Sequence, residues 1–405
     1  MAYRILSLDG GGTFCLIQAR ALAELYPGQS GHQLLRNFDL VAACSGGSFV
    51  AAALFADKSP TDILELFRSQ RLRERFFRPR GWQQRIKHSW LAQFDTHSKA
   101  DLIREVTGEA GEKTMGQLRA PGLPDLLIVG YDFQYDKAKL FRSRADSAGA
   151  NFPRSASRLR LRDAVSASTH APLRWFSGVA RPEGGDHFGY WDGAMTGFNN
   201  PVLLATAEAL ANGAKREDVR ALSIGTSCTE LLPADTRCDP ALKVGTPRSG
   251  FFSDLVKAGR AIVGEPPDAD TYLAHICLSS QVPREEGHRI PSPIVRLNPV
   301  VHPCRAGQHW APPARFTHES FGRLVRLDIS ATEDAEVALL DGLCASWIGG
   351  ETHNQSVRRR GDYFGLNEGG SWNEALCCEI GDLRFADAAQ RWHGVQEPAR
   401  EVAVA

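Results

Sequence analysis

A strand that runs into a glycine cluster and then into a helix opens the chain, and this order constrains its fold more than any other feature. Residues 3–8 are a short apolar segment, an acidic residue and three glycines follow, and residues 15–26 have the apolar spacing of a helix. The order returns with a predicted strand at 38–42, a tight turn of small residues at 44–48 and a predicted helix at 49–56. Strands that alternate with helices favour a parallel sheet covered on both faces. The predicted fold class is therefore α/β, with a mainly parallel central sheet sandwiched by helices.

The alternation continues further along the chain. Residues 126–131 and 221–224 predict buried strands, and residues 201–212 predict a helix between them. Residues 332–347 predict a longer helix, with Thr332 as its cap ahead of acidic residues in the first turn.

Composition changes in the second half of the chain. Residues 240–313 are rich in proline, glycine and charge, which predicts insertions and surface structure with one amphipathic helix at 251–263. Residues 357–370 hold three consecutive arginines and several glycines, which predicts an extended tail. The expected division of the chain is a core in residues 1–230, the remainder of that domain with its insertions in 231–348, and a partly irregular extension in 349–405.

The bulk composition excludes several classes of protein. Because 47 basic residues balance 47 acidic ones, no overall field attracts nucleic acid or membrane. The longest obvious apolar run, residues 49–56, is far shorter than the ~20 residues that cross a bilayer, and the first residues lack the pattern of a secretory signal. The nine scattered cysteines fit neither a disulfide framework nor a zinc site. We expect a cytoplasmic globular protein with reduced thiols and no bound metal.

The first glycine turn has the chemistry of an anion site. Gly10, Gly11 and Gly12 leave three consecutive backbone N–H groups without side chains in front of them, and the helix start adds partial positive charge. Such a turn suits an oxyanion or a phosphate. A plain tight turn without a ligand is an equally good interpretation of these residues taken alone.

The second turn, ACSGGS at residues 43–48, has the outline of a nucleophile elbow. An elbow presents its serine at the start of a helix, on a strained turn that tolerates only small neighbours. Ala43 and Gly47 meet this need on the two sides of Ser45. Taken alone, the turn fits a simple helix cap slightly better, with Ser45 or Ser48 bonding the first amides.

A carboxylate follows much later, in the sequence WDGA at residues 191–194. Aspartate before glycine is often only a turn. Together with Ser45 it gains a further use, because a carboxylate within hydrogen-bond reach accepts the serine proton as a general base during acyl transfer. Ser45 and Asp192 therefore form a candidate dyad. Three of the twelve histidines are alternative bases: His170, His275 and His302. His170 is the one to test if the carboxylate fails.

In this order the three segments resemble the patatin-like phospholipase family, whose pattern is a DGGG oxyanion turn, a Gly-x-Ser-x-Gly elbow and an Asp-Gly-Gly/Ala motif. Residues 165–172 (VSASTHAP) and 222–226 (LSIGT) are similar to two secondary segments of that family. The resemblance covers about residues 3–227. It implies the family's three-layer fold, related to the α/β hydrolases, followed by a C-terminal extension.

The resemblance implies a lipid acyl hydrolase of the phospholipase A type that needs no cofactor. Asp192 would take the proton of Ser45, which attacks an ester carbonyl and forms an acyl-enzyme. The amides of Gly10, Gly11 and Gly12 would stabilise the oxyanion, and water would release the acyl group.

The sequence departs from the family pattern in two places. Ala43 stands where the elbow usually begins with glycine, and Thr13-Phe14 replaces the usual apolar-Arg pair after the glycine turn. The second change removes a cation expected beside the oxyanion turn. It concerns how the site is closed or tuned, and leaves the backbone donors in place.

Residues 68–87 hold eight basic residues against the single acid Glu74, with aromatic residues between them. Such a segment suits the surface of an anionic bilayer, although a solvated helix face is a slightly better interpretation. Nucleic-acid binding fits poorly, because the chain is neutral overall and has a single basic patch. The predicted membrane-contact residues are Phe76, Phe77, Arg78, Arg80 and Trp82.

The resemblance also bears on partners. Some bacterial members of the family are membrane-degrading effectors that a signalling nucleotide switches on, and the region after Ser227 has room for such a control site. We expect a phospholipid membrane surface as a peripheral partner. A small-molecule nucleotide activator is left open by the sequence, as is the oligomeric state.

Two other functions compete with this interpretation. A sugar kinase of the actin-like ATPase group would use the glycine turn for phosphate and Asp9 for magnesium, but it leaves Ser45 and Asp192 unexplained. A lipid- or nucleotide-binding module with a dead site is disfavoured, because Ser45 and Asp192 are both intact.

Overall fold

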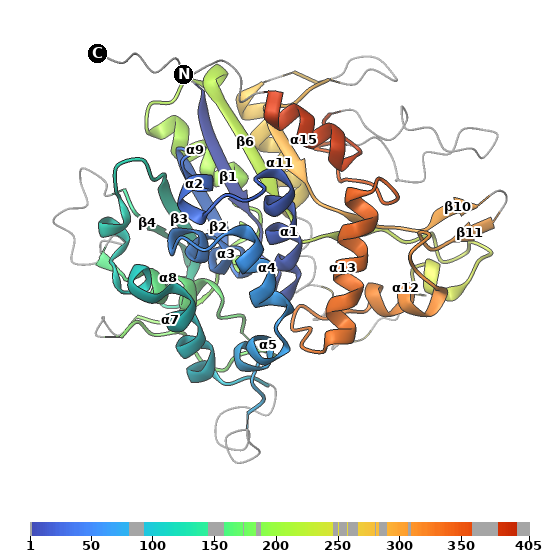
Figure 1. Ribbon diagram of the computed structural model, residues 1–405, viewed down its shortest axis with the longest axis horizontal. Helices are drawn as coiled ribbons and strands as arrows, with labels where there is room; N and C mark the ends of the chain where they lie inside the picture. Colours follow the sequence, from blue (N-terminus) through green and yellow to red (C-terminus); the bar gives the residue numbers. More distant parts are fainter. Residues whose placement is uncertain are drawn as a thin grey trace.

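The framework of the protein is a seven-stranded sheet with the strand order β4-β3-β2-β1-β6-β8, in which β5 also pairs with β3 (Figure 1). The strands are β1 (Tyr3–Leu8), β2 (Leu40–Cys44), β3 (Asp125–Asp132), β4 (Lys137–Arg142), β5 (Tyr190–Asp192), β6 (Val219–Ile224) and β8 (Ile294–Leu297). All neighbours pair in parallel except β4 and β5, which run antiparallel to β3. The predicted α/β class with a mainly parallel sheet is confirmed.

This computed structural model of the 405-residue chain describes residues 2–80, 93–144, 158–172, 174–183, 188–245, 250, 257, 266–279, 281–282, 290–306, 309–358 and 380–394. In this part of the chain no helix is both long enough and apolar enough to cross a membrane.

Helices cover both faces of the sheet, and alternate side chains of each strand serve the two faces. Leu6 and Leu8 of β1 belong to the larger core, whereas Ile5 belongs to the core on the opposite face. The larger core is built with α1 (Leu16–Leu25), α2 (Gly31–Leu35), α3 (Gly46–Phe55), α4 (Pro60–Arg68), α7 (Thr96–Glu112), α8 (Leu161–Ser168), α12 (His318–Val325), α13 (Asp334–Ile348) and α15 (Phe385–Gly394). The opposite core is built with α9 (Val202–Ala211) and α11 (Pro266–Leu278). The short α5 (Gln70–Phe76) follows α4.

The two strand, turn and helix units form with shifted boundaries. A 3₁₀ turn, Gly12–Cys15, precedes α1, and β2 ends only at Cys44. Helix α3 begins at Gly46 rather than at residue 49, because the small residues of the turn pack as its buried first turn. Helix α13 is capped at Glu333 instead of Thr332, and the Glu336 carboxylate accepts the N–H groups of both residues.

The prediction of surface insertions in residues 240–313 is wrong for an important part of that region. It contains β8, a buried strand of the main sheet, and α11 on the opposite core. It also contains the small hairpin of β10 (Cys304–Ala306) and β11 (His309–Ala311), while β9 (Val300–Val301) pairs with β7 (Cys228–Thr229). The helix predicted at 251–263 lies outside the described residues except for Lys257.

Part of the predicted C-terminal extension packs against residues near the start of the chain. Trp392 of α15 is fully buried, and its indole N–H donates to the hydroxyl of Tyr26 over 2.7 Å. Its ring stacks on Phe38 with the centroids 5.8 Å apart. The last described helix therefore packs against the opening unit of the chain (Figure 1).

Candidate active site

Ser45 occupies the sharp turn between β2 and α3. Its backbone has φ 47° and ψ −126°, a strained conformation for a residue with a side chain. Ala43 lies in β2 directly before the turn and is fully buried. A Cβ atom on Gly47 would lie 2.5 Å from the backbone oxygen of Leu8, so the turn packs tightly against β1. These features are those of a nucleophile elbow.

We expect Gly47→Ala to lower the free energy of unfolding by about 1–3 kcal/mol or more. The new methyl group would collide with backbone atoms of Leu8 and Asp9, which have no rotamer to move aside. Urea denaturation measures the change. Gly245→Ala is the matched control, because nothing lies within 4 Å of a Cβ at that position. Equal stability of Gly47→Ala and wild type would contradict the tight packing of the elbow.

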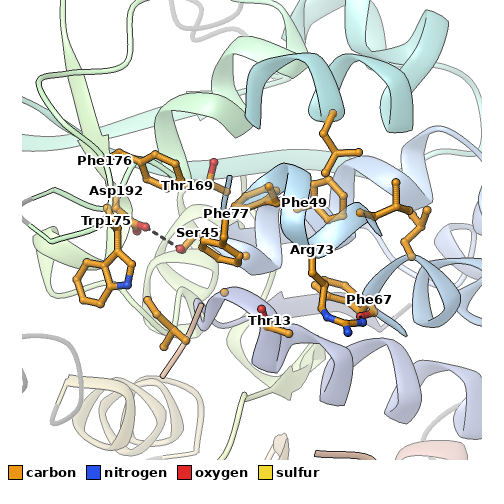
Figure 2. Close-up of a pocket in the computed structure, with 18 of the residues that line it drawn as sticks. Thr13, Ser45, Phe49, Phe67, Arg73, Phe77, Thr169, Trp175, Phe176 and Asp192 are labelled. Atoms are coloured by element: carbon orange, nitrogen blue, oxygen red, sulfur yellow. Dashed lines mark hydrogen bonds between the residues drawn. The ribbon is translucent and has the colours of Figure 1, made fainter. Parts of the chain in front are cut away.

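Asp192 ends β5 and faces Ser45. The Ser45 hydroxyl donates to Oδ2 of Asp192 over 2.7 Å, as Figure 2 shows, and Oδ1 accepts the N–H of Ala194 over 2.9 Å. Both side chains are buried, and Asp192 is only 4% exposed. Burial raises the pKa of Asp192 to about 6, against the bonds from Ala194 and Ser45 and the charge of Lys99. A carboxylate with a pKa near neutrality, held on the serine oxygen, has the geometry of a general base.

The three histidines considered as alternative bases bond elsewhere. The ring of His170 faces the backbone oxygen of Ser177 at 3.3 Å, and burial lowers the pKa of His170 well below its usual range. His275 and His302 bond to groups outside the pocket that contains Ser45. The hydroxyl of Ser45 is thus committed to Asp192 and not to a histidine.

The glycine turn lies directly against the elbow, but it does not present three donors. The N–H of Gly10 already donates to the backbone oxygen of Asn199 over 2.9 Å, so it is not available to an oxyanion. The prediction of Gly10 as an oxyanion donor is therefore wrong. Within the described part of the chain, the N–H groups of Gly11 and Gly12 have no acceptor. Gly12 lines the same pocket as Ser45. Gly11 and Gly12 are therefore the two amides of this turn with a hydrogen available for an oxyanion.

A cation does lie at this turn, but it comes from β8. The guanidinium of Arg296 donates to the two carboxylate oxygens of Asp9 over 3.0 and 2.6 Å, and one of its nitrogens also reaches Ser223. Both partners are buried. Burial raises the pKa of Asp9, and the Arg296 charge beside it opposes that rise. Phe14 stands where the family pattern has an arginine, and the N–H of Thr13 before it donates to the backbone oxygen of Ile329.

An apolar pocket opens beside the dyad, with an empty volume of about 680 Å³ that includes its opening to solvent. In Figure 2, Ser45 and Asp192 lie on one side of it with Trp175 and Phe176, while Phe67 and Arg73 lie on the other. Its polar lining is small. The apolar wall consists of Phe49, Leu66, Phe67, Leu72, Phe76, Phe77, Leu102, Val106, Trp175 and Phe176. An apolar lining of this kind is chemically suited to a hydrocarbon chain next to a nucleophile.

The structure corrects the prediction of membrane contact for Phe76 and Phe77. Phe77 is 6% exposed and packs among other phenylalanine rings, and Phe76 packs on it with the ring centroids 4.9 Å apart. These two residues face the interior, because they build the pocket. Arg78 is exposed and Arg80 is half-buried, and Trp82 lies outside the described residues.

Two further residues, Ser168 and Lys99, were not predicted as site residues. The hydroxyl of Ser168 accepts the N–H of Ser45 over 2.8 Å and donates to the backbone oxygen of Val129. Lys99 lies buried nearby. Ser168 belongs to the small-residue segment 165–172, and that segment could have identified it as a site residue. Lys99 could not be identified in this way, because a single lysine within a polar helix has no distinguishing pattern. Among the described side chains, no group of three or more His, Cys, Asp or Glu is arranged to hold a metal ion.

Comparisons with known proteins agree on one family of sequences. Residues 6–206 match the family described as patatin-like phospholipase. A "cGAMP-activated phospholipase" of Pseudomonas aeruginosa is 28% identical over 270 residues, which are 64% of this chain and 73% of the relative. One of the same description from Vibrio cholerae is 28% identical over 242 residues, which are 55% of this chain and 64% of that relative, just under two thirds of its length.

Two solved structures are also similar. VipD from Legionella pneumophila aligns with 84% of this chain and 67% of its own, at 13% identity and a TM-score of 0.36. ExoU of Pseudomonas aeruginosa, solved with SpcU, aligns with 42% of this chain and 38% of its own, at 14% identity and a TM-score of 0.27.

Proposed function

We propose, from the match of residues 6–206 to the patatin-like phospholipase family, that this chain is a phospholipase A-type lipid acyl hydrolase. Its substrates are phospholipids, from which it releases ester-linked fatty acids. The observation that carries the proposal is the 2.7 Å hydrogen bond between Ser45 and Asp192 at the side of an apolar pocket. A nucleophile, its base and a site for a hydrocarbon chain are the parts that such a reaction needs.

Catalysis proceeds through an acyl-enzyme. Asp192 takes the hydroxyl proton of Ser45 while the serine oxygen attacks the ester carbonyl carbon, and the carbonyl oxygen becomes an oxyanion. The N–H groups of Gly11 and Gly12 stabilise that oxyanion. Collapse of the intermediate breaks the ester bond, and protonated Asp192 returns the proton to the leaving alcohol. Water, deprotonated by the same carboxylate, then releases the fatty acid.

The rate of this reaction should fall on the acid side of neutrality. The base works only as a carboxylate, so a raised pKa of Asp192 removes activity as the pH drops through about 6. The group is ionised above that pH and protonated below it, hence kcat/KM for a water-soluble ester should be half-maximal near pH 6. A midpoint near pH 4, typical of an exposed carboxyl group, would exclude a buried carboxylate as the essential base.

The reaction takes place at a phospholipid membrane surface, which the protein contacts peripherally. The exposed Arg78 is the part of the predicted contact segment that is available for anionic headgroups. The proposal includes a nucleotide activator, since two relatives at 28% identity are named cGAMP-activated phospholipases. We propose that cGAMP raises the rate of lipid hydrolysis by this chain.

The test is release of fatty acid from phospholipid vesicles by the purified protein, with and without cGAMP. Ser45→Ala, prepared in the same way, measures contaminating lipase. Release that requires Ser45 and increases with cGAMP supports both parts of the proposal. Release that requires Ser45 and ignores cGAMP removes the activator alone, and no release above the Ser45→Ala blank in either condition removes the phospholipase function. Neither the family match nor the relatives support the sugar-kinase alternative.

A further inference from the structure

Lys99 is a buried cation that the proposed chemistry does not use. It lies in α7, its side chain is fully buried, and its ammonium group donates to the backbone oxygen of Ser166 over 2.9 Å and to the hydroxyl of Thr169 over 3.3 Å. The ammonium also lies 4.5 Å from the ring centroid of Phe176. Among the described residues it has no ion-pair partner within bonding distance. Burying an ammonium group without an ion-pair partner lowers the stability of the fold. We therefore expect Lys99 to have a role beyond packing.

The segment that Lys99 holds also holds both members of the dyad. We call residues 166–170, the end of α8 and the two residues after it, the dyad bracket. Within the bracket, the hydroxyl of Ser168 accepts the N–H of Ser45 over 2.8 Å. Two residues later, the backbone oxygen of His170 accepts the N–H of Asp192 over 3.0 Å. Lys99 bonds to the bracket at Ser166 and Thr169, one on each side of Ser168. A shift of this short segment would therefore move the nucleophile and the base together.

The charge of Lys99 acts on the base as well. Asp192 of β5 is the carboxylate whose charge opposes the lowering of the Lys99 pKa, which burial brings to about 7. In return, the Lys99 charge opposes the rise of the Asp192 pKa that burial causes. The buried thiols of Cys15 and Cys44 interact with the Asp192 charge, and burial raises the pKa of both thiols. His170 of the bracket is also affected by Lys99: burial lowers the pKa of His170, with further lowering by Lys99 and Arg80. His170 is thus neutral, and Lys99 is the cation whose charge acts on the Asp192 carboxylate.

We propose that Lys99 is a positioning residue for the reaction, which fixes the dyad bracket and, in its protonated form, favours the ionised form of Asp192. The catalytic meaning of this role rests on the proposed phospholipase function. The coupling between the two charges does not, because it exists whether or not the protein turns over a lipid. A lysine that only capped the end of α8 would hold Ser166 in the same way and leave the titration of Asp192 unchanged.

The test measures the titration of Asp192 directly, by ¹³C NMR of protein labelled at the aspartate carboxyl carbons, with Asp192→Asn to assign the signal. In Lys99→Met, which keeps the length of the side chain and removes its charge, the Asp192 midpoint should rise by about half a pH unit or more. Lys113→Met is the matched control. It removes an exposed lysine at the end of the same helix and should leave the midpoint in place.

A reciprocal measurement keeps the proposal open to refutation if Lys99→Met does not fold. By linkage, the removal of the Asp192 charge must lower the titration midpoint of Lys99, read from its ¹³C-labelled ε carbon in Asp192→Asn against wild type. Asp192→Asn preserves the shape of the side chain and is the milder variant. An unchanged Lys99 midpoint in Asp192→Asn overturns the proposal, and so does an unchanged Asp192 midpoint in folded Lys99→Met. Both midpoints are measurable in a protein that hydrolyses nothing, so failure of the phospholipase function is recognised separately.

Discussion

Ser45→Ala should reduce fatty-acid release by on the order of 10⁴-fold or more, and Asp192→Asn by on the order of 10²- to 10⁴-fold. Alanine leaves no oxygen to form the acyl-enzyme, so the first variant retains only what the oxyanion donors and the pocket contribute. Asparagine still accepts from Ala194 but cannot take a proton from the serine. The losses belong in kcat rather than in KM, because neither change alters the apolar wall of the pocket.

The neighbouring Ser48 is a stringent control for the nucleophile. It lies in the first turn of α3, is fully buried, and donates to the backbone oxygen of Ser45 over 2.6 Å rather than to Asp192. Ser48→Ala should therefore retain most of the activity, at a cost in stability of about 1 kcal/mol. Initial rates on vesicles and melting temperatures should be recorded for all three variants. If Ser48→Ala loses as much activity as Ser45→Ala without unfolding, the assignment of Ser45 as the nucleophile is untenable.

The dyad could be predicted from sequence because each of its members lies in a motif with local geometry. Ser45 follows an apolar strand and precedes small residues, so an elbow is the one turn in which this serine gains exposure to a reacting group. Asp192 ends a short strand before Gly193, and a Cβ on Gly193 would lie 2.4 Å from the backbone of Val129. In both cases, residues adjacent in the sequence restrict the backbone around the functional side chain, and a sequence pattern can detect such residues.

The rest of the site depends on contacts between distant segments. The N–H of Gly10 is taken by Asn199, and no pattern around Gly10 reveals which backbone oxygen will lie above it. Phe77 points into the interior because its ring packs against the rings of Phe94 and Phe176. The sequence pattern of basic and aromatic residues predicted a surface segment there, but the two phenylalanine residues of that segment line the pocket. Strand β8 was missed because three apolar residues and one arginine within a region rich in proline and glycine are too short a signal.

Arg296→Met should be the most destabilising substitution at the site, lowering the free energy of unfolding by about 3–5 kcal/mol. It leaves the Asp9 carboxylate buried without the guanidinium that now bonds to both of its oxygens. Activity should fall with stability even in the folded fraction, because Asp9 begins the turn that carries the free N–H groups of Gly11 and Gly12. Urea denaturation and vesicle assays at a temperature where the variant is folded separate the two effects.

The double variant Asp9→Asn with Arg296→Met distinguishes loss of the ion pair from loss of packing. If the unpaired charge is what destabilises Arg296→Met, neutralising Asp9 should recover part of the stability, and the two single changes should be non-additive by about 0.5–3 kcal/mol. The exposed pair of Arg315 and Glu351 is the matched control. Arg315→Met should cost no more than about 1 kcal/mol, because solvent screens that pair. Additive effects at Asp9 and Arg296 would mean that the guanidinium acts there by filling space.

This ion pair also indicates which parts of the chain hold the glycine turn in place. Arg296 lies 287 positions after Asp9 and outside residues 6–206, in a strand that completes the sheet beside β6. The glycine turn is therefore held from one side by Asn199 and from the other by a side chain beyond the family match. We expect residues 1–230 alone to be unable to form a stable turn, since they retain Asp9 and lack its counter-charge. Fatty-acid release and a cooperative urea transition by that fragment would contradict this expectation. If the fragment shows neither, and the effects of Asp9→Asn and Arg296→Met are non-additive, then β8 is needed to hold the turn that carries the N–H groups of Gly11 and Gly12.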